Sequence, residues 1–137
     1  MKKALASIAV GLALVSTAFA SAANTNFKVT TTPPTAVKKG QPAVAKVHIE
    51  GTNGFGVNVN YPMQLIIKPP AGVTVDKATQ TKADTVVFKT TGADFNVTFT
   101  SADVGTKAFT GELKFGVATE KEANPVTTQV AFSVDVK

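Results

Sequence analysis

The sequence predicts an all-β fold, an antiparallel β-sandwich of immunoglobulin-like type. Three observations lead to this prediction. Apolar and polar residues alternate in short segments throughout residues 24–137, which is the period of a half-buried strand. Turn residues such as Gly, Pro, Asn and Asp interrupt these segments about every 8–12 residues. No segment after residue 23 has the spacing of a helix.

The first 23 residues have the pattern of a bacterial export signal. Two lysines follow the initial Met, residues 4–15 form an apolar run, and a small-x-small cleavage signal ends at Ala20. A second possible cleavage site follows Ala23. The apolar run is short for a transmembrane helix, although a retained anchor is the alternative. We expect a periplasmic or secreted protein, free of the membrane after cleavage, with one domain over residues 24–137.

Composition excludes several classes of site. The chain has no Cys, which rules out disulfides, thiol chemistry and zinc sites built from thiolates. Its single His excludes a His-rich metal site. The basic residues are all Lys and are scattered, whereas nucleic-acid sites cluster charge and use Arg. We therefore expect no enzyme activity, no metal, no cofactor and no nucleic-acid partner.

The strands are expected at regular intervals along the chain, separated by proline and glycine turns. The clearest is the last, because Val126, Val130, Phe132 and Val134 share one face while Gln129 and other polar residues lie opposite. The expected strands are residues 27–29, 43–50, 55–61, 63–67, 73–75, 85–89, 95–100, 109–117 and 126–136. The side chains expected to point inward are Val47, Ile49, Leu65, Ile67, Phe88, Phe95, Val97, Phe99, Leu113, Phe115, Val130, Phe132 and Val134.

The polar residues form no motif that indicates catalysis. His48 is expected on the polar face of its strand, where a lone His is usually a surface residue. The carboxylates at Asp76, Asp84, Asp94 and Asp103 are assigned to turns, and their spacing matches no calcium loop. Residues 76–83 are polar and are expected to form a loop.

Two segments resemble the periplasmic N-terminal domain of the thiol–disulfide interchange protein DsbD and its stand-alone relatives. The first runs from Gly54-Phe-Gly-Val-Asn to Tyr61-Pro62 and on through residues 65–73. The second is residues 114–126, which read Lys-Phe-Gly-Val-Ala-Thr-Glu-Lys-Glu-Ala-Asn-Pro-Val. The family has a Gly-aromatic-His-x-Asn run before a Pro, and later a strand that ends in Cys, a polar loop and a second Cys. The resemblance implies an immunoglobulin-like sandwich that exchanges electrons with other exported proteins.

This chain departs from the family at the residues that carry the chemistry. Ala118 and Ala123 occupy the positions expected for the two redox cysteines, and Gly56 occupies the position expected for the His. A methyl group cannot replace a thiolate nucleophile, so the resemblance implies a redox-inactive member. It would act as a binding module for a thioredoxin-fold or other periplasmic protein. The residues implied for binding are Phe55, Asn58, Tyr61 and Pro125.

The alternative function is a generic immunoglobulin-like module with a structural or adhesive role. Such a module can pair subunits through an exposed edge strand, because an edge presents unpaired backbone groups to another chain.

Overall fold

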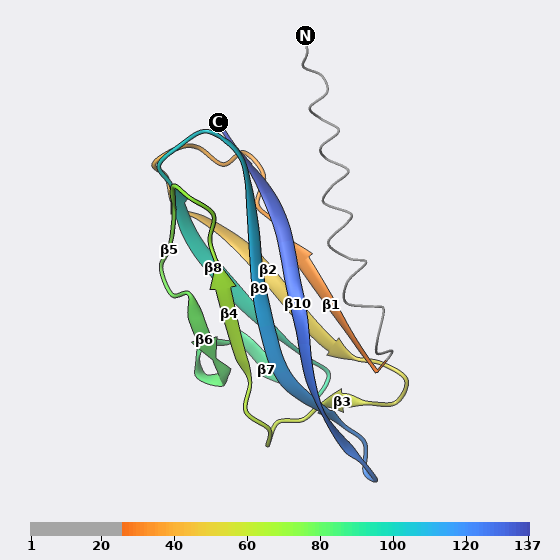
Figure 1. The fold of residues 1–137 in the computed structure, drawn as a ribbon. Coiled ribbons are helices and arrows are strands. Elements are labelled where there is room, and N and C mark those ends of the chain that lie inside the picture. The colour runs from red at the N-terminus through yellow and green to blue at the C-terminus, as the bar shows by residue number, and fades with distance from the viewer. Residues whose placement is uncertain (1–25) are drawn as a thin grey trace.

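The computed structural model describes residues 26–137, and it confirms an all-β sandwich of two antiparallel sheets (Figure 1). Sheet A has the strand order β1-β2-β8-β5, with β7 also paired to β8. Sheet B has the order β10-β9-β4-β6, with β3 also paired to β9. The predicted export signal and its cleavage sites lie outside the described residues. No helix within residues 26–137 is long and apolar enough to cross a membrane.

The strand bounds follow the alternation in the sequence closely. They are β1 Phe27–Thr32, β2 Ala43–Gly51, β3 Gly56–Val57, β4 Gln64–Lys68, β5 Val73–Val75, β6 Thr79–Thr81, β7 Val87–Lys89, β8 Gly92–Ser101, β9 Gly105–Ala118 and β10 Ala123–Val136. A single 3₁₀ turn, η1, covers Lys82–Asp84.

Strands β9 and β10 form a long hairpin that is the backbone of sheet B. Their register runs without interruption from Ala118 opposite Ala123 to Gly105 opposite Val136. The polar link is therefore only residues 119–122, shorter than the sequence suggested, and β10 begins before Pro125 rather than after it. A proline is tolerated there because β10 is an edge strand whose outward N–H groups need no partner within the sheet.

The core lies between the two sheets and is built around aromatic contacts. The Phe109 ring stacks on Phe132 with centroids 4.7 Å apart and meets Phe99 edge-on at 4.9 Å, which joins the two sheets. The Phe27 ring meets Phe115 edge-on at 5.5 Å. Apart from Phe88, which is half-buried, every side chain predicted to point inward is buried. Each fully buried apolar side chain contributes roughly 1.5–3 kcal/mol before entropy is counted.

The expected strand over residues 55–61 is mostly wrong, because only Gly56–Val57 pairs with β9. The chain then turns, since the Tyr61 amide donates to the Asn58 carbonyl at 3.1 Å and the Asn60 amide donates to the Asn58 side chain at 3.0 Å. Asn is a common turn former because its side chain accepts such local hydrogen bonds. The alternation at Val59 is therefore not that of a strand, and its side chain is exposed.

The expected loop over residues 76–83 contains a strand and a 3₁₀ turn instead. Its β6 strand, Thr79–Thr81, was missed because its one inward residue, Gln80, is polar. The Gln80 amide is buried and donates to the Asn96 carbonyl at 2.9 Å, which satisfies it inside the sandwich. The strand expected over residues 85–89 is also shorter, because β7 covers only Val87–Lys89, and Val86 is exposed.

The sandwich has one long free edge, which belongs to β10. In Figure 1 this strand runs the length of the molecule beside β1, which belongs to the other sheet. The only further bridge to β10 in residues 26–137 is a parallel one between Val37 and Val136, at the C-terminal end of the strand. It is held by the Lys137 amide, which donates to the Val37 carbonyl, and by the Lys39 amide, which donates to the Lys137 carbonyl, both at 2.9 Å.

Candidate binding surfaces

The structure gathers three of the four predicted binding residues around Gly116 on the outer face of sheet B. The Asn58 amide donates to the Gly116 carbonyl at 2.8 Å, and Pro125 is the register partner of Gly116 on β10. The Tyr61 ring covers Gly116 so closely that an added Cβ would lie 2.8 Å from its Cγ. We call Asn58, Tyr61, Gly116 and Pro125 the Gly116 platform. It fixes an aromatic side chain, 37% exposed, on the surface of the sheet.

The fourth predicted binding residue, Phe55, lies apart from this platform. Its side chain is half-buried and packs against the core, and its amide donates to the Thr52 carbonyl at 3.0 Å. Phe55 therefore has a structural role in the turn between β2 and β3, and little of it is available to a partner.

The two positions that the family resemblance assigns to cysteines face each other across the β9–β10 hairpin. Ala118 and Ala123 are register partners, and Gly56 of β3 pairs with Ala118 from the other side. The Thr119 amide donates to the Glu122 carbonyl at 2.8 Å, so the next pair along the ladder is of the non-hydrogen-bonded type, in which side chains lie closest. Gly56 has no room for a His, because a Cβ there would lie 2.9 Å from the Thr90 carbonyl oxygen.

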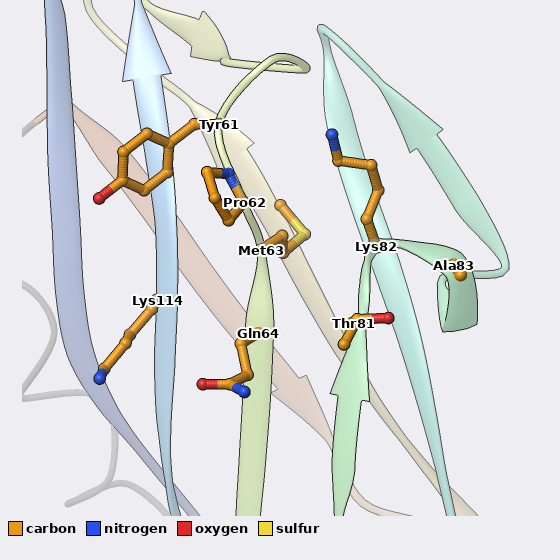
Figure 2. Close-up of a pocket in the computed structure, with 8 residues that line it drawn as sticks. All are labelled: Tyr61, Pro62, Met63, Gln64, Thr81, Lys82, Ala83 and Lys114. Carbon is orange, nitrogen blue, oxygen red and sulfur yellow. The ribbon is translucent and has the colours of Figure 1, made fainter.

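An open pocket of about 630 Å³ lies beside the Gly116 platform (Figure 2). It is lined by Tyr61, Pro62, Met63, Gln64, Thr81, Lys82, Ala83 and Lys114. The Lys82 ammonium is already engaged, since it donates to the Val59 carbonyl at 2.5 Å and lies 5.3 Å from the centre of the Phe88 ring. The lining holds no His, Asp, Glu or Cys, so it offers no imidazole, carboxylate or thiolate.

The free edge of β10 carries backbone groups that point away from the sheet. Antiparallel pairs alternate between hydrogen-bonded and non-hydrogen-bonded types. With Thr119 and Glu122 as a bonded pair, the even-numbered residues of β10 bond to β9, and the odd-numbered ones point outward. The bonds that Lys137 makes to Val37 and Lys39 have the same phase. Thus Thr127, Gln129, Ala131 and Ser133 present their N–H and C=O groups at the edge.

Sheet A carries a charged cluster on its outer face that the sequence did not reveal. The His48 ring lies between Asp94, which contacts its Nδ1, and Glu50, whose carboxylate is 3.2 Å from its Nε2. The assignment of Asp94 to a turn was wrong, because it lies in β8 as the register partner of His48. The hydrogen bond to Asp94 is the main cause that raises the pKa of His48, and Glu50 adds to it while burial opposes both.

This cluster is a site of ion pairs. The His side chain is 38% exposed and its two nitrogens are both occupied by carboxylates. Within residues 26–137, no group of three or more His, Cys, Asp or Glu side chains is arranged to hold a metal ion. Sequence reasoning missed the cluster because His48 and Asp94 are far apart in the chain and meet only through the pairing of β2 with β8.

No protein-family model and no curated protein matches the sequence. Among solved structures, the chain is similar to a cohesin module from a family 33 glycoside hydrolase of Clostridium perfringens, with a TM-score of 0.50 and 13% identity, covering 83% of this chain and 100% of the module. It is also similar to a PapD-like domain of human CEP192, with a TM-score of 0.44 and 12% identity over 82% of this chain and 86% of that one. A third is AggA, the major subunit of an Escherichia coli adherence fimbria, with a TM-score of 0.43 and 10% identity over 81% and 94%.

The similarity to the cohesin module shows the shared immunoglobulin-like fold. An identity of 13% is too low to carry a partner or an activity from one chain to the other. The function must therefore be argued from the surfaces of this molecule.

Proposed function

We propose that this chain is an exported, non-enzymatic immunoglobulin-like module that binds another protein chain by adding a strand to the edge of β10. The observation that carries the proposal is the length of that edge. Strand β10 has 14 residues, Ala123–Val136, and in the described part of the chain only Val136 has a second strand partner. An unpaired edge of this kind is a template for a strand from another chain.

The residues along the edge support the proposal because nothing in them repels a partner. No charged residue occurs between Val126 and Val134. Natural proteins normally protect an edge with Lys, Pro, a bulge or a short strand. Here Pro125 stands near one end and Asp135 near the other, and the β9–β10 register contains no bulge. The middle of the strand is left free for pairing.

Strand addition also fits the rest of the surface. The backbone groups of Thr127, Gln129, Ala131 and Ser133 would supply the hydrogen bonds of a new ladder, which give affinity to a partner of any sequence. Inward residues of the added strand would cover the rim of the core beside Val130 and Phe132, both of which are buried. No catalytic step is needed, and neither the pocket nor the Gly116 platform contains a nucleophile paired with a base.

The test compares an edge variant with a matched variant one strand away. Gln129→Lys places a charge on the free edge, and Ala108→Lys places the same charge on the same face of β9. Capture from an extract of exported proteins is run with wild type and both variants. We expect one partner to be retained by wild type and by Ala108→Lys and to be lost from Gln129→Lys. Equal retention by all three would show that β10 is not the binding edge.

A second candidate function is the redox-inactive DsbD-like module, which we propose on one observation. Ala118 and Ala123 are cross-strand partners at the end of the hairpin, and three of the four residues implied for binding lie beside them or around Gly116. In this proposal the hairpin end docks a thioredoxin-fold protein of the periplasm. Gly56 has no room for the His that the family has at this position, so in this proposal the chain differs from the family there as well as at the two cysteines.

The double change Ala118→Cys with Ala123→Cys tests this candidate. Cross-strand partners of the non-hydrogen-bonded type have Cα atoms about 4.5 Å apart, within the range of a disulfide. We expect an intramolecular bridge in air and its reduction by a thioredoxin-like protein, followed by thiol titration. A matched control is Ala118→Cys with Ala131→Cys, which lie far apart on the hairpin. Free thiols after oxidation, or a bridge that a thioredoxin-like protein leaves intact, would remove the DsbD-like candidate.

A further inference from the structure

The free stretch of β10 has two defined ends, and its midpoint is Val130. At one end Pro125 lacks an N–H group, so a ladder cannot continue through it. At the other end the Val37 segment already occupies the edge beyond Asp135, through its bridge to Val136 and its bonds to Lys137. An incoming strand can therefore pair along residues 126–134, and the centre of that stretch is Val130.

We propose that the partner on this edge is a second copy of the same chain, paired β10 to β10 in antiparallel orientation about a two-fold axis at Val130. The inference rests on the proposed function, because it needs β10 to be the binding edge. Antiparallel pairing of one strand with its own copy generates a closed two-fold dimer, the commonest symmetry of soluble assemblies. The two B sheets then form one continuous sheet.

The residues opposite one another in this register are compatible on both faces. On the outer face Thr127 lies opposite Ser133 of the second copy, and Gln129 lies opposite Ala131. These are the odd-numbered residues, whose N–H and C=O groups point outward, so each pair can exchange both hydrogen bonds. Thr and Ser opposite each other add a favourable cross-strand contact.

On the inner face, the same register brings together apolar side chains, except that Thr128 lies opposite Phe132 of the second copy. Val126 lies opposite Val134 of the second copy, and Val130 lies opposite itself. All three are buried within one sandwich at its rim, with exposed fractions of 6%, 2% and 3% respectively. The dimer therefore extends the core of each sandwich toward the other.

The lack of charge in the middle of β10 is what allows this strand to pair with a copy of itself. Self-pairing places each residue opposite a residue of the same strand, so a charged strand would meet its own sign, and like charges directly opposite are destabilising. The stretch from Val126 to Val134 has no charge. At the ends Asp135 lies opposite Pro125 of the second copy, so the register also keeps the two aspartates apart.

Disulfide trapping tests this register directly, because the chain contains no other thiol. Gln129→Cys and Ala131→Cys are made separately, given tags of different mass, mixed and oxidised. The two cysteines would be directly opposite, with Cα atoms about 5.5 Å apart, within the range of a disulfide. The control is Ala108→Cys mixed with Gln129→Cys, which places one thiol on β9. We expect the mixed dimer of 129 and 131 to form at least about ten times faster than the control dimer, with protein between about 1 µM and 1 mM.

A second variant checks that trapping reports pairing and not collision. Ala131→Pro removes an N–H group that points away from β9, so the hairpin should keep its own bonds. Sedimentation equilibrium of wild type should show a monomer–dimer equilibrium, and Ala131→Pro should remain monomeric with an unchanged circular dichroism spectrum. A wild-type monomer at every concentration, or trapping no faster than the control, would overturn the self-pairing.

The outcomes separate this inference from the proposed function. If trapping fails while Gln129→Lys still loses a partner that Ala108→Lys retains, self-pairing is wrong and strand addition by another protein stands. If Gln129→Lys keeps its partner, β10 is not the binding edge and both proposals are wrong.

Discussion

The two edge strands of sheet B, β6 and β10, differ in length and in charge, and therefore in how readily another strand could pair with them. Edge strand β6 has only three residues, Thr79–Thr81, and runs directly into the η1 turn. Asp84 closes this edge, because it accepts hydrogen bonds from the Thr81 amide at 2.9 Å and from the Lys77 ammonium at 2.7 Å. Edge strand β10 has 14 residues and no charge over its middle.

The difference shows that the features which normally protect an edge strand are present at β6 and are missing from the middle of β10. A short strand followed by a charged turn prevents strand addition at β6. The Lys77 ammonium, with the Thr81 amide second, lowers the pKa of Asp84, so this carboxylate stays charged to lower pH than an ordinary Asp. Residues 126–134 of β10, at the other edge of the same sheet, carry no charge and have no second strand partner, which supports the proposal that they bind another strand.

The largest expected effect is the loss of folding when a charge is placed on the buried face of β10. Phe132→Asp would bury a charge against Phe109, whose ring now stacks on Phe132 at 4.7 Å. An unpaired buried charge costs several kcal/mol, which is comparable to the whole stability of a small domain. We expect an unfolded protein by far-UV circular dichroism. The matched change Gln129→Asp, on the opposite face of the same strand, should remain folded; equal loss in both would contradict the burial pattern of β10.

A smaller effect is expected at Gly116 on the outer face of sheet B, which the Tyr61 ring covers. Gly116→Ala would place a Cβ 2.8 Å from Cγ of Tyr61, so the ring must move off the sheet. We expect a loss of about 1–3 kcal/mol in the free energy of unfolding, as for other overpacking changes. Urea denaturation measures it. The double variant with Tyr61→Ala should lose less than the sum of the two single changes, and strict additivity would show that Tyr61 does not cover Gly116.

The smallest effect lies on sheet A, at the charged cluster around His48 on its outer face. The pKa of His48 is raised, chiefly by its hydrogen bond to Asp94, so the protonated ring favours the folded state. This contribution is fully present below the unfolded pKa of about 6.5 and is lost as the pH rises through the higher folded value. Because the side chain is 38% exposed, we expect it to be worth about 0.2–1 kcal/mol.

His48→Gln checks this assignment. The variant should be less stable than wild type near pH 5.5 and nearly equal to it at pH 9, as measured by urea denaturation at the two values. The reverse order, with the larger loss at high pH, would mean that the ring is held neutral in the folded protein and that Asp94 does not govern its pKa.

Local alternation was enough to predict most of the strands and the core, but not the features that depend on pairing between strands. Val130 and Phe132 were correctly placed inward because their period is visible in the sequence of residues 126–136. The strand β6 was missed because Gln80 is polar and is satisfied by Asn96, a residue of another strand.

The candidate surfaces could not be predicted from the sequence, because they depend on the order of the strands in each sheet and on the register between them. Gly116 gives no sign in the sequence that the Tyr61 ring covers it, and His48 gives none that Asp94 will be its partner. The alternation of β10 predicted a strand, but only the strand order of sheet B shows that this strand lies at an edge.

Amide hydrogen exchange along β10 tests most directly the claim that this edge is open and takes a strand from another chain. In dilute protein the outward amides of Gln129 and Ala131 should exchange fast, while those of Val130 and Phe132, which bond to β9, should be protected. At high concentration, or with the captured partner, the outward amides should gain protection and the inward ones should not change. Outward amides that are as protected as the inward ones in dilute protein, or that stay fast when the partner is bound, would contradict the account.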